Sequence, residues 1–310
     1  MTLRALSAAL LLALAPATLA FQPPAAPPAK AAAKDAPPTV TLLEPGAQPR
    51  RALRYTPKDG FTQTFVMTMA FEQQQEINGQ AVPGVPTPPM KMALDLRLLD
   101  RTDGGFRYAA VFAKCEVLDR EGVTPVMKDA MQKALESTKG LEMTMSSTDR
   151  AVITDASIKA PANMNPAFNQ LLGNLEQSLK QFATPLPAED IGVGARWEVA
   201  SHPSVMGMKM DLKMVYTIES IDGSVIKLKV DQTGIHQSGQ ADFPGMPRGM
   251  VVNITSGETR SSGSITLDLS QVLPIKAATD GSSTIEMSME QNGQKTPVKN
   301  KTRVKMEVGN

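Results

Sequence analysis

Methionine recurs at a two-residue spacing along this chain. Eleven of the nineteen methionines stand in Met-x-Met arrangements, namely Met67/Met69, Met90/Met92, Met143/Met145, Met206/Met208/Met210 and Met287/Met289. Successive side chains of a β-strand point to opposite faces, so this period places each set on one face of a strand. We therefore expect several strands to contribute thioethers to a shared surface. That surface can be an ordinary core, a pocket for an apolar ligand or a soft-metal site.

The same alternation extends through most of the chain after residue 51. The apolar residues of 61–71, 90–98, 208–218, 226–230 and 265–269 share one parity within each segment, and a last short strand is expected at 304–308. Asn78-Gly79, Asp222-Gly223 and Asp280-Gly281 are typical of hairpin turns, and residues 141–158 read as a hairpin turning near 147–150. Long antiparallel strands are therefore the main expectation.

Two segments follow a helical period instead. Residues 124–138 carry an apolar stripe that ends at Gly140, and residues 165–182 begin at Asn165-Pro166 with Leu171, Leu175 and Leu179 on one stripe. The predicted fold is therefore α+β. It is a strongly curved antiparallel sheet, or half-barrel, with an inserted pair of helices that cap its concave face.

The first 50 residues predict a signal peptide for export followed by a linker. Arg4 precedes an apolar run and small residues at 18 and 20, as in a secretory signal peptide over residues 1–20. Residues 21–50 are dominated by Pro, Ala and Lys, which indicates a disordered, polyproline-like linker. Residues 51–310 are then expected to form one half-barrel domain. We expect the mature chain to be soluble, in a periplasm or outside the cell, with no transmembrane segment.

Charge and motif content argue against several functions. Lys and Arg total 32 against 31 Asp and Glu, so no excess of positive charge favours nucleic acid as a partner. The two histidines, His202 and His236, lie in no metal-ligand spacing, and Cys115 is a lone cysteine in an apolar segment. Ser224 and Lys227 match a Ser-x-x-Lys motif, but a strand separates their side chains. We expect a non-enzymatic protein without a cofactor.

An apolar ligand is the favoured partner, because methionine is flexible and polarizable and adapts to irregular apolar molecules. The expected lining of the concave face is Met67, Met69, Leu94, Met208, Met210 and Met287, with Leu171, Leu175 and Leu179 facing it from the helix. The partner would be a lipid or another apolar small molecule. The alternatives are copper(I) bound through Met-x-Met pairs, since thioethers bind that ion well, and a structural or interaction module with a dry core.

Two short motifs carry a family resemblance. Pro185-Leu186-Pro187 followed by Val193-Gly194-Ala195-Arg196-Trp197, and the later segment 263–268, resemble motifs of a family of uncharacterised exported bacterial proteins. The plan of residues 51–310 is similar to the outer-membrane lipoprotein-carrier fold. The resemblance implies a half-barrel sheet with an apolar ligand on its concave side, and no catalytic residues.

Overall fold

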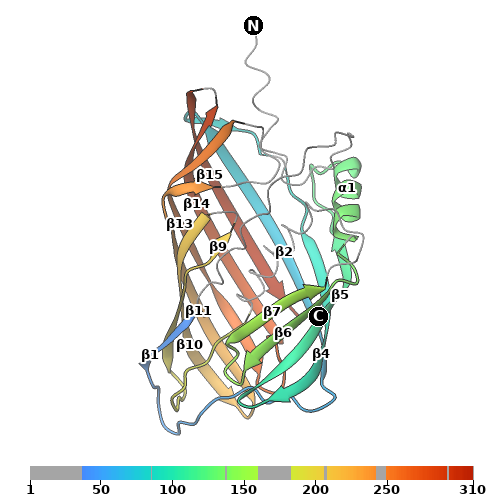
Figure 1. The fold of residues 1–310 in the computed structure, drawn as a ribbon, viewed down its shortest axis with the longest axis vertical. Coiled ribbons are helices and arrows are strands. Elements are labelled where there is room, and N and C mark those ends of the chain that lie inside the picture. Colours follow the sequence, from blue (N-terminus) through green and yellow to red (C-terminus); the bar gives the residue numbers. More distant parts are fainter. Residues whose placement is uncertain are drawn as a thin grey trace.

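A single antiparallel sheet forms most of the molecule (Figure 1). The structure is a computed structural model, and it describes residues 37–84, 86–136, 138–159, 183–205, 208–241, 249–291 and 293–309. Within these residues fifteen strands belong to the one sheet. Their order is β1-β8-β10-β11-β13-β14-β15-β2-β4-β5-β6-β7, with the short strands β9, β3 and β12 beside β10, β2 and β13.

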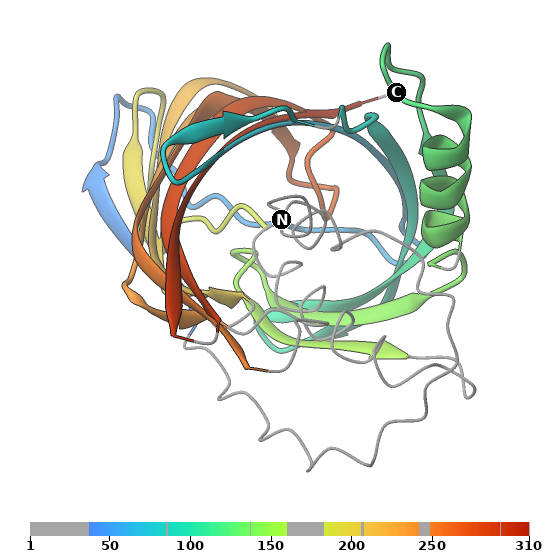
Figure 2. The ribbon, with the colours of Figure 1, turned by 90° about the horizontal axis from the view of Figure 1, so that it is seen from above.

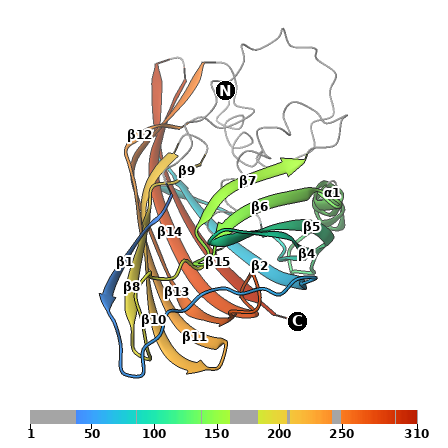
Figure 3. The same cartoon turned by 60° about the horizontal axis from the view of Figure 1, so that its bottom comes forward.

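The element bounds, in chain order, are β1 Thr39–Glu44, β2 Thr62–Ile77, β3 Gln80–Val82, β4 Met90–Thr102, β5 Gly105–Val117, α1 Pro125–Glu136, β6 Glu142–Thr148, β7 Ile153–Lys159, β8 Arg196–Ser201, β9 Ser204–Val205, β10 Met208–Asp222, β11 Val225–His236, β12 Gly239–Ala241, β13 Met250–Asp268, β14 Lys276–Gln291 and β15 Gln294–Val308. The sheet curls strongly, yet β1 and β7 remain its two edges and do not pair with one another (Figures 2 and 3).

The predicted α+β class with two capping helices is wrong. The described residues hold one helix, α1, and it lies outside the curve of the sheet rather than over its concave face (Figure 2). There it packs beside the part of β5 that β6 does not reach. Gln132 accepts a hydrogen bond from the Val117 N–H at 2.8 Å and donates one to the Cys115 carbonyl at 3.1 Å. The helix therefore supplies hydrogen-bond partners for backbone groups at a free strand edge. Its apolar stripe did not predict this role. The second predicted helix, residues 165–182, lies outside the described residues.

Of the three predicted Asn-Gly and Asp-Gly turns, two are confirmed, and the hairpin predicted over residues 141–158 is formed by β6 and β7. Asn78-Gly79 and Asp222-Gly223 both form tight hairpin connections, and Asn78, Gly79 and Gly223 all have positive φ angles. Asp280-Gly281, by contrast, lies inside β14. A Cβ on Gly281 would come within 2.7 Å of the Ser261 Cβ, so this glycine permits the close approach of β13 rather than a turn.

The strands are also longer than the apolar runs suggested. β13 extends from Met250 to Asp268, although residues 251–264 are rich in Ser, Thr and Gly. β15 likewise spans Gln294–Val308, where only a short last strand was expected. β1 lies within the segment predicted as a linker. It forms a strand there because it pairs with β8, and Val40 and Leu42 are half-buried against that strand. Pairing with a neighbouring strand thus decides strand length here.

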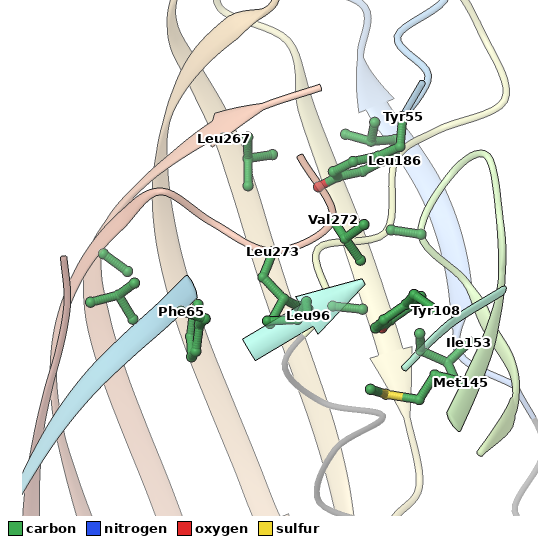
Figure 4. Packing of buried hydrophobic residues seen from close by; sticks show 14 of the residues in the cluster. Tyr55, Phe65, Leu96, Tyr108, Met145, Ile153, Leu186, Leu267, Val272 and Leu273 are labelled. Atoms are coloured by element: carbon green, nitrogen blue, oxygen red, sulfur yellow. The ribbon is translucent and has the colours of Figure 1, made fainter. Parts of the chain in front are cut away.

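The main core fills one end of the concave face. The loops after β1, before β8 and after β13 pass inside the curve of the sheet (Figure 2). Tyr55, Leu186 and Leu273 from these loops meet Leu96 and Tyr108 from the strands (Figure 4). We call this the larger cluster. The smaller cluster, at the other end of β13, β14 and β15, consists of buried Ala241, Val252, Ile254, Met287 and Val298.

Trp197 anchors the larger cluster. Its side chain is fully buried, stacks on Tyr216 at a centroid distance of 5.3 Å, and donates from Nε1 to the Pro185 carbonyl at 2.9 Å. This joins the loop before β8 to the inner face of the sheet.

Candidate functional site

Methionines from three neighbouring strands lie side by side on the inner face. Met69 in β2 is directly opposite Met90 in β4 and Met306 in β15, and Met67 is directly opposite Met92. Directly opposed residues of an antiparallel pair share a face, and their Cβ atoms are about 4.5–5.5 Å apart. These five residues form what we call the methionine patch. Met306 has no Met-x-Met partner, so the sequence pattern did not include it.

The patch borders the larger cluster but is not fully enclosed by it. Met67 is 4% exposed and belongs to that cluster, whereas Met69, Met90, Met92 and Met306 are half-buried. Cys115 lies opposite Met92, is buried, and has its Sγ 3.5 Å from the Thr138 Oγ1. The patch therefore presents adaptable, polarizable side chains on the concave side of the sheet.

The residues predicted to line the concave face share that face but do not form one group. Met67, Met69 and Leu94 lie in or against the larger cluster, whereas Met208 and Met287 pack in the smaller one. Met210 is half-buried opposite His236. Leu171, Leu175 and Leu179, the helix residues predicted to face them, lie outside the described residues. That this face binds a ligand stays a prediction.

A polar belt separates the two clusters on the same inner face. The belt consists of Gln73, Gln75, His236, Thr259, Ser283, Asn300 and Thr302, contributed by β2, β11, β13, β14 and β15. The register runs in one row from Gly234 through Thr259, Ser283 and Thr302 to Gln73. Sequence reasoning missed this belt because it followed apolar side chains alone. The parity of Phe71 and Ile77 already assigns Gln73 and Gln75 to the inner face.

Hydrogen bonds link the belt, but two of its polar atoms lack a partner. The His236 Nε2 and the Thr259 Oγ1 are 3.1 Å apart, and that hydroxyl donates to the Ser283 Oγ at 2.9 Å. Among the described residues, the His236 Nδ1 and the Gln75 Nε2 are buried without a hydrogen-bond partner. Burial lowers the pKa of His236 below its usual value, so its imidazole is neutral at neutral pH.

The charges at this level lie on the opposite face. Lys301 pairs with Glu76 at 2.9 Å, Lys299 with Glu286 at 2.8 Å and Arg303 with Asp280 at 2.6 Å. The inner-facing residues described in β2, β11, β13, β14 and β15 include no Asp, Glu, Lys or Arg. These five strands therefore have an uncharged inner face and a charged outer face.

The charged outer face carries a separate open hollow of about 630 Å³. Its charged lining residues are Asp231, Arg260, Asp280 and Arg303. Arg303 already forms two hydrogen bonds to Asp280, at 2.9 and 2.6 Å, and Asp231 pairs with Lys229. These charges are largely satisfied within the chain, which makes the hollow a weaker candidate than the inner face.

Neither a membrane span nor an ordinary metal site emerges from the described residues. No helix among them has the length and apolar character needed to cross a membrane. The same part of the chain contains no group of three or more His, Cys, Asp and Glu side chains placed to hold a metal ion.

A family model matches part of the chain. Residues 134–274 match a family of unknown function (DUF6263). The matched segment runs from the end of α1 through β13, so it includes Trp197 and the β11 and β13 parts of the polar belt. It excludes the methionine patch. No curated protein and no solved structure matches the chain significantly.

Proposed function

We propose that the chain is an exported, non-enzymatic protein that binds a lipid or another apolar molecule on the concave face of its sheet. The observation that carries this proposal is the exposure of the methionine patch. Met69, Met90, Met92 and Met306 lie on the face that also holds the core, yet each is only half-buried. Partly exposed apolar side chains gathered on a concave surface are typical of a ligand site.

Methionine chemistry supports an adaptable site. Its unbranched side chain and soft sulfur allow one surface to fit apolar partners of different shape. The larger cluster closes one end of the concave face with Tyr55, Leu186 and Leu273, so an apolar ligand would lie against a rigid floor. The analogy with lipoprotein carriers, which also use a curved sheet, belongs to this proposal. So does export, for which the first 20 residues are the support.

Extraction tests whether a ligand is present. The mature chain is purified, extracted with organic solvent, and the extract is analysed by mass spectrometry, together with binding of the apolar dye N-phenyl-1-naphthylamine. We expect co-purified lipid and saturable dye binding. An empty extract together with no dye binding would overturn the proposal.

A pair of variants locates the site. Met90 and Lys91 are neighbours on β4 and point to opposite faces. Met90→Gln preserves side-chain length but places an amide against the ligand, at a cost of about 1–2 kcal/mol, which is about tenfold in affinity. Lys91→Gln should leave dye binding unchanged. Equal effects of the two substitutions would show that the dye does not bind on the inner face.

Copper(I) binding is a second candidate, favoured by the direct cross-strand contact of Met69 with Met90 and Met306. Three thioethers on adjacent strands supply ligands of the softness that copper(I) prefers. Competition with a chromophoric copper(I) chelator tests it. A defined stoichiometry that Met306→Leu abolishes would favour a metal carrier. A chain that binds neither copper(I) nor dye would be a structural or interaction module with a dry core.

A further inference from the structure

The polar belt restricts which apolar molecule the inner face can accept. It lies next to the methionine patch, and the two share strands β2 and β15. Along β2, Met69 and Gln73 are four residues apart, which is about 13 Å in an extended strand. A ligand that is apolar over its whole length would cover the belt and bury polar groups without partners, which is unfavourable.

The unpaired polar atoms point to what would satisfy the belt. The His236 Nδ1 and the Gln75 Nε2 are buried and have no hydrogen-bond partner within the described residues. A buried donor or acceptor left unpaired costs about 1–3 kcal/mol. Strands β15, β14 and β13 separate Gln75 in β2 from His236 in β11, and neighbouring strands are about 4.8 Å apart, so one small polar group can reach only one of the two. Gln75 is the one next to the methionine patch, and a ligand that supplies its missing hydrogen bond would remove the cost there.

The charge distribution decides what kind of polar group that is. The inner-facing residues described in the five strands of the belt include no acid and no Lys or Arg. The cations at this level, Lys299, Lys301 and Arg303, are on the outer face and paired with carboxylates. A charged headgroup on the inner face would lose hydration without gaining a counter-ion.

We infer that the ligand is an amphiphile with an uncharged, hydrogen-bonding headgroup, such as an alcohol, amide or ester. The headgroup lies on the belt beside Gln75, and the hydrocarbon lies on the methionine patch, which shares strand β2 with Gln75. This inference rests on the proposed binding of an apolar ligand and narrows it to a chemical class. It excludes free fatty acids and other anionic lipids as preferred ligands.

Chain-matched ligands test the class. Dodecanol, dodecanamide and dodecanoate share one hydrocarbon chain, and at about pH 8 only dodecanoate is charged. Displacement of N-phenyl-1-naphthylamine from the full chain measures each affinity. We expect the alcohol and the amide to bind at least about tenfold more tightly than the carboxylate. Equal or tighter binding of dodecanoate would overturn the inference while leaving apolar binding in place. Failure of the dye and all three ligands would instead overturn the proposed function.

Two neighbouring glutamines provide the matched variants. Gln75 faces the belt, whereas Gln74 is exposed on the outer face of the same strand. Gln75→Leu should weaken dodecanamide binding about three- to tenfold and leave dye binding unchanged, since it removes one hydrogen-bonding group. Gln74→Leu should change neither. Gln75→Leu removes an amide nitrogen that is buried without a partner, so the fold should tolerate it. Unchanged dodecanamide affinity in Gln75→Leu would place the headgroup elsewhere and overturn the inference.

Discussion

Met69 in β2 is the direct cross-strand partner of Met90 in β4. The two residues are distant in sequence and belong to different Met-x-Met pairs, yet the register places their side chains next to each other on one face. Met306 occupies the corresponding position on the other side of Met69. The two-residue methionine period along single strands thus becomes a row of thioethers across three strands.

Burial predicts unequal effects for two methionines of the same pair. Met67 is 4% exposed within the larger cluster, whereas Met69 is half-buried. Met67→Ala should lower the free energy of unfolding by about 2–4 kcal/mol and Met69→Ala by about 1 kcal/mol. Urea unfolding followed by circular dichroism measures both. Equal losses would mean that Met69 is as enclosed as Met67, so the methionine patch would not expose the apolar surface on which the proposed ligand binding depends.

Trp197 should be sensitive to a change that preserves its aromatic character. Trp197→Phe removes the hydrogen bond to the Pro185 carbonyl and leaves a cavity where the larger ring packed. We expect a loss of about 2–3 kcal/mol in the free energy of unfolding, measured by urea titration with circular dichroism. Val193→Ala is the control, because Val193 is 46% exposed and should change stability little. A loss in Trp197→Phe no larger than in the control would contradict the anchoring role.

The pH dependence of stability should report on His236. Burial lowers its pKa in the folded chain, so the unfolded chain binds the proton more readily. Stability should therefore fall as the pH drops below the ordinary histidine pKa of about 6.5, and this fall should level off below the lowered pKa. The neighbours of His236 across the strands, Met210, Gly257 and Thr259, carry no charge that would offset it.

Two histidine variants separate this contribution from others. Urea midpoints at about pH 7.5 and about pH 5.5 should differ less in His236→Gln than in the unchanged chain. His202 is exposed beside Asp211, with 2.7 Å between the His202 Nδ1 and the Asp211 Oδ1. His202→Gln should leave the fall caused by His236 in place. If His236→Gln has the same pH dependence as the unchanged chain, the imidazole is not buried in the folded state.

Two glycines with different surroundings should respond differently to alanine. A Cβ on Gly192 would collide with the Ala47 carbonyl oxygen and come within 3.0 Å of the Pro49 carbonyl oxygen. Gly239 in β12 has nothing within 4 Å of that position. Gly192→Ala should lower the free energy of unfolding by several kcal/mol, because both contacts are backbone atoms, and Gly239→Ala should be within about 0.5 kcal/mol of neutral. Thermal unfolding of the two variants checks this, and similar melting temperatures would contradict it.

Local patterns predicted much of the sheet. The hairpin turns at Asn78-Gly79 and Asp222-Gly223 were correct because their backbone conformations need positive φ, which these residue types adopt easily. Asp280-Gly281 was misread because the same residue type also permits close strand packing. The sequence bounds of helix α1 were predicted to within two residues. Its place in the fold was predicted wrongly, because an apolar stripe does not specify which surface the helix will cover.

Local patterns also predicted only part of the candidate site. The residues predicted to line one concave surface fall into separate regions of the inner face, and their binding of a ligand stays a prediction. The polar belt between those regions was missed. Gln73 and Gln75 are unremarkable in sequence, and they become a candidate site only when β15, β14 and β13 place Asn300, Thr302, Ser283 and Thr259 beside them.

The alternation of residue types by itself determined that this chain forms strands and which side chains of each strand share a face. That information is local, since a side chain's direction follows from the geometry of its own backbone. Only the tertiary structure decided the strand order, which brings β2 between β15 and β4 and so joins Met69 to Met90 and Met306. Strand order depends on pairings between distant segments, and no local pattern encodes them.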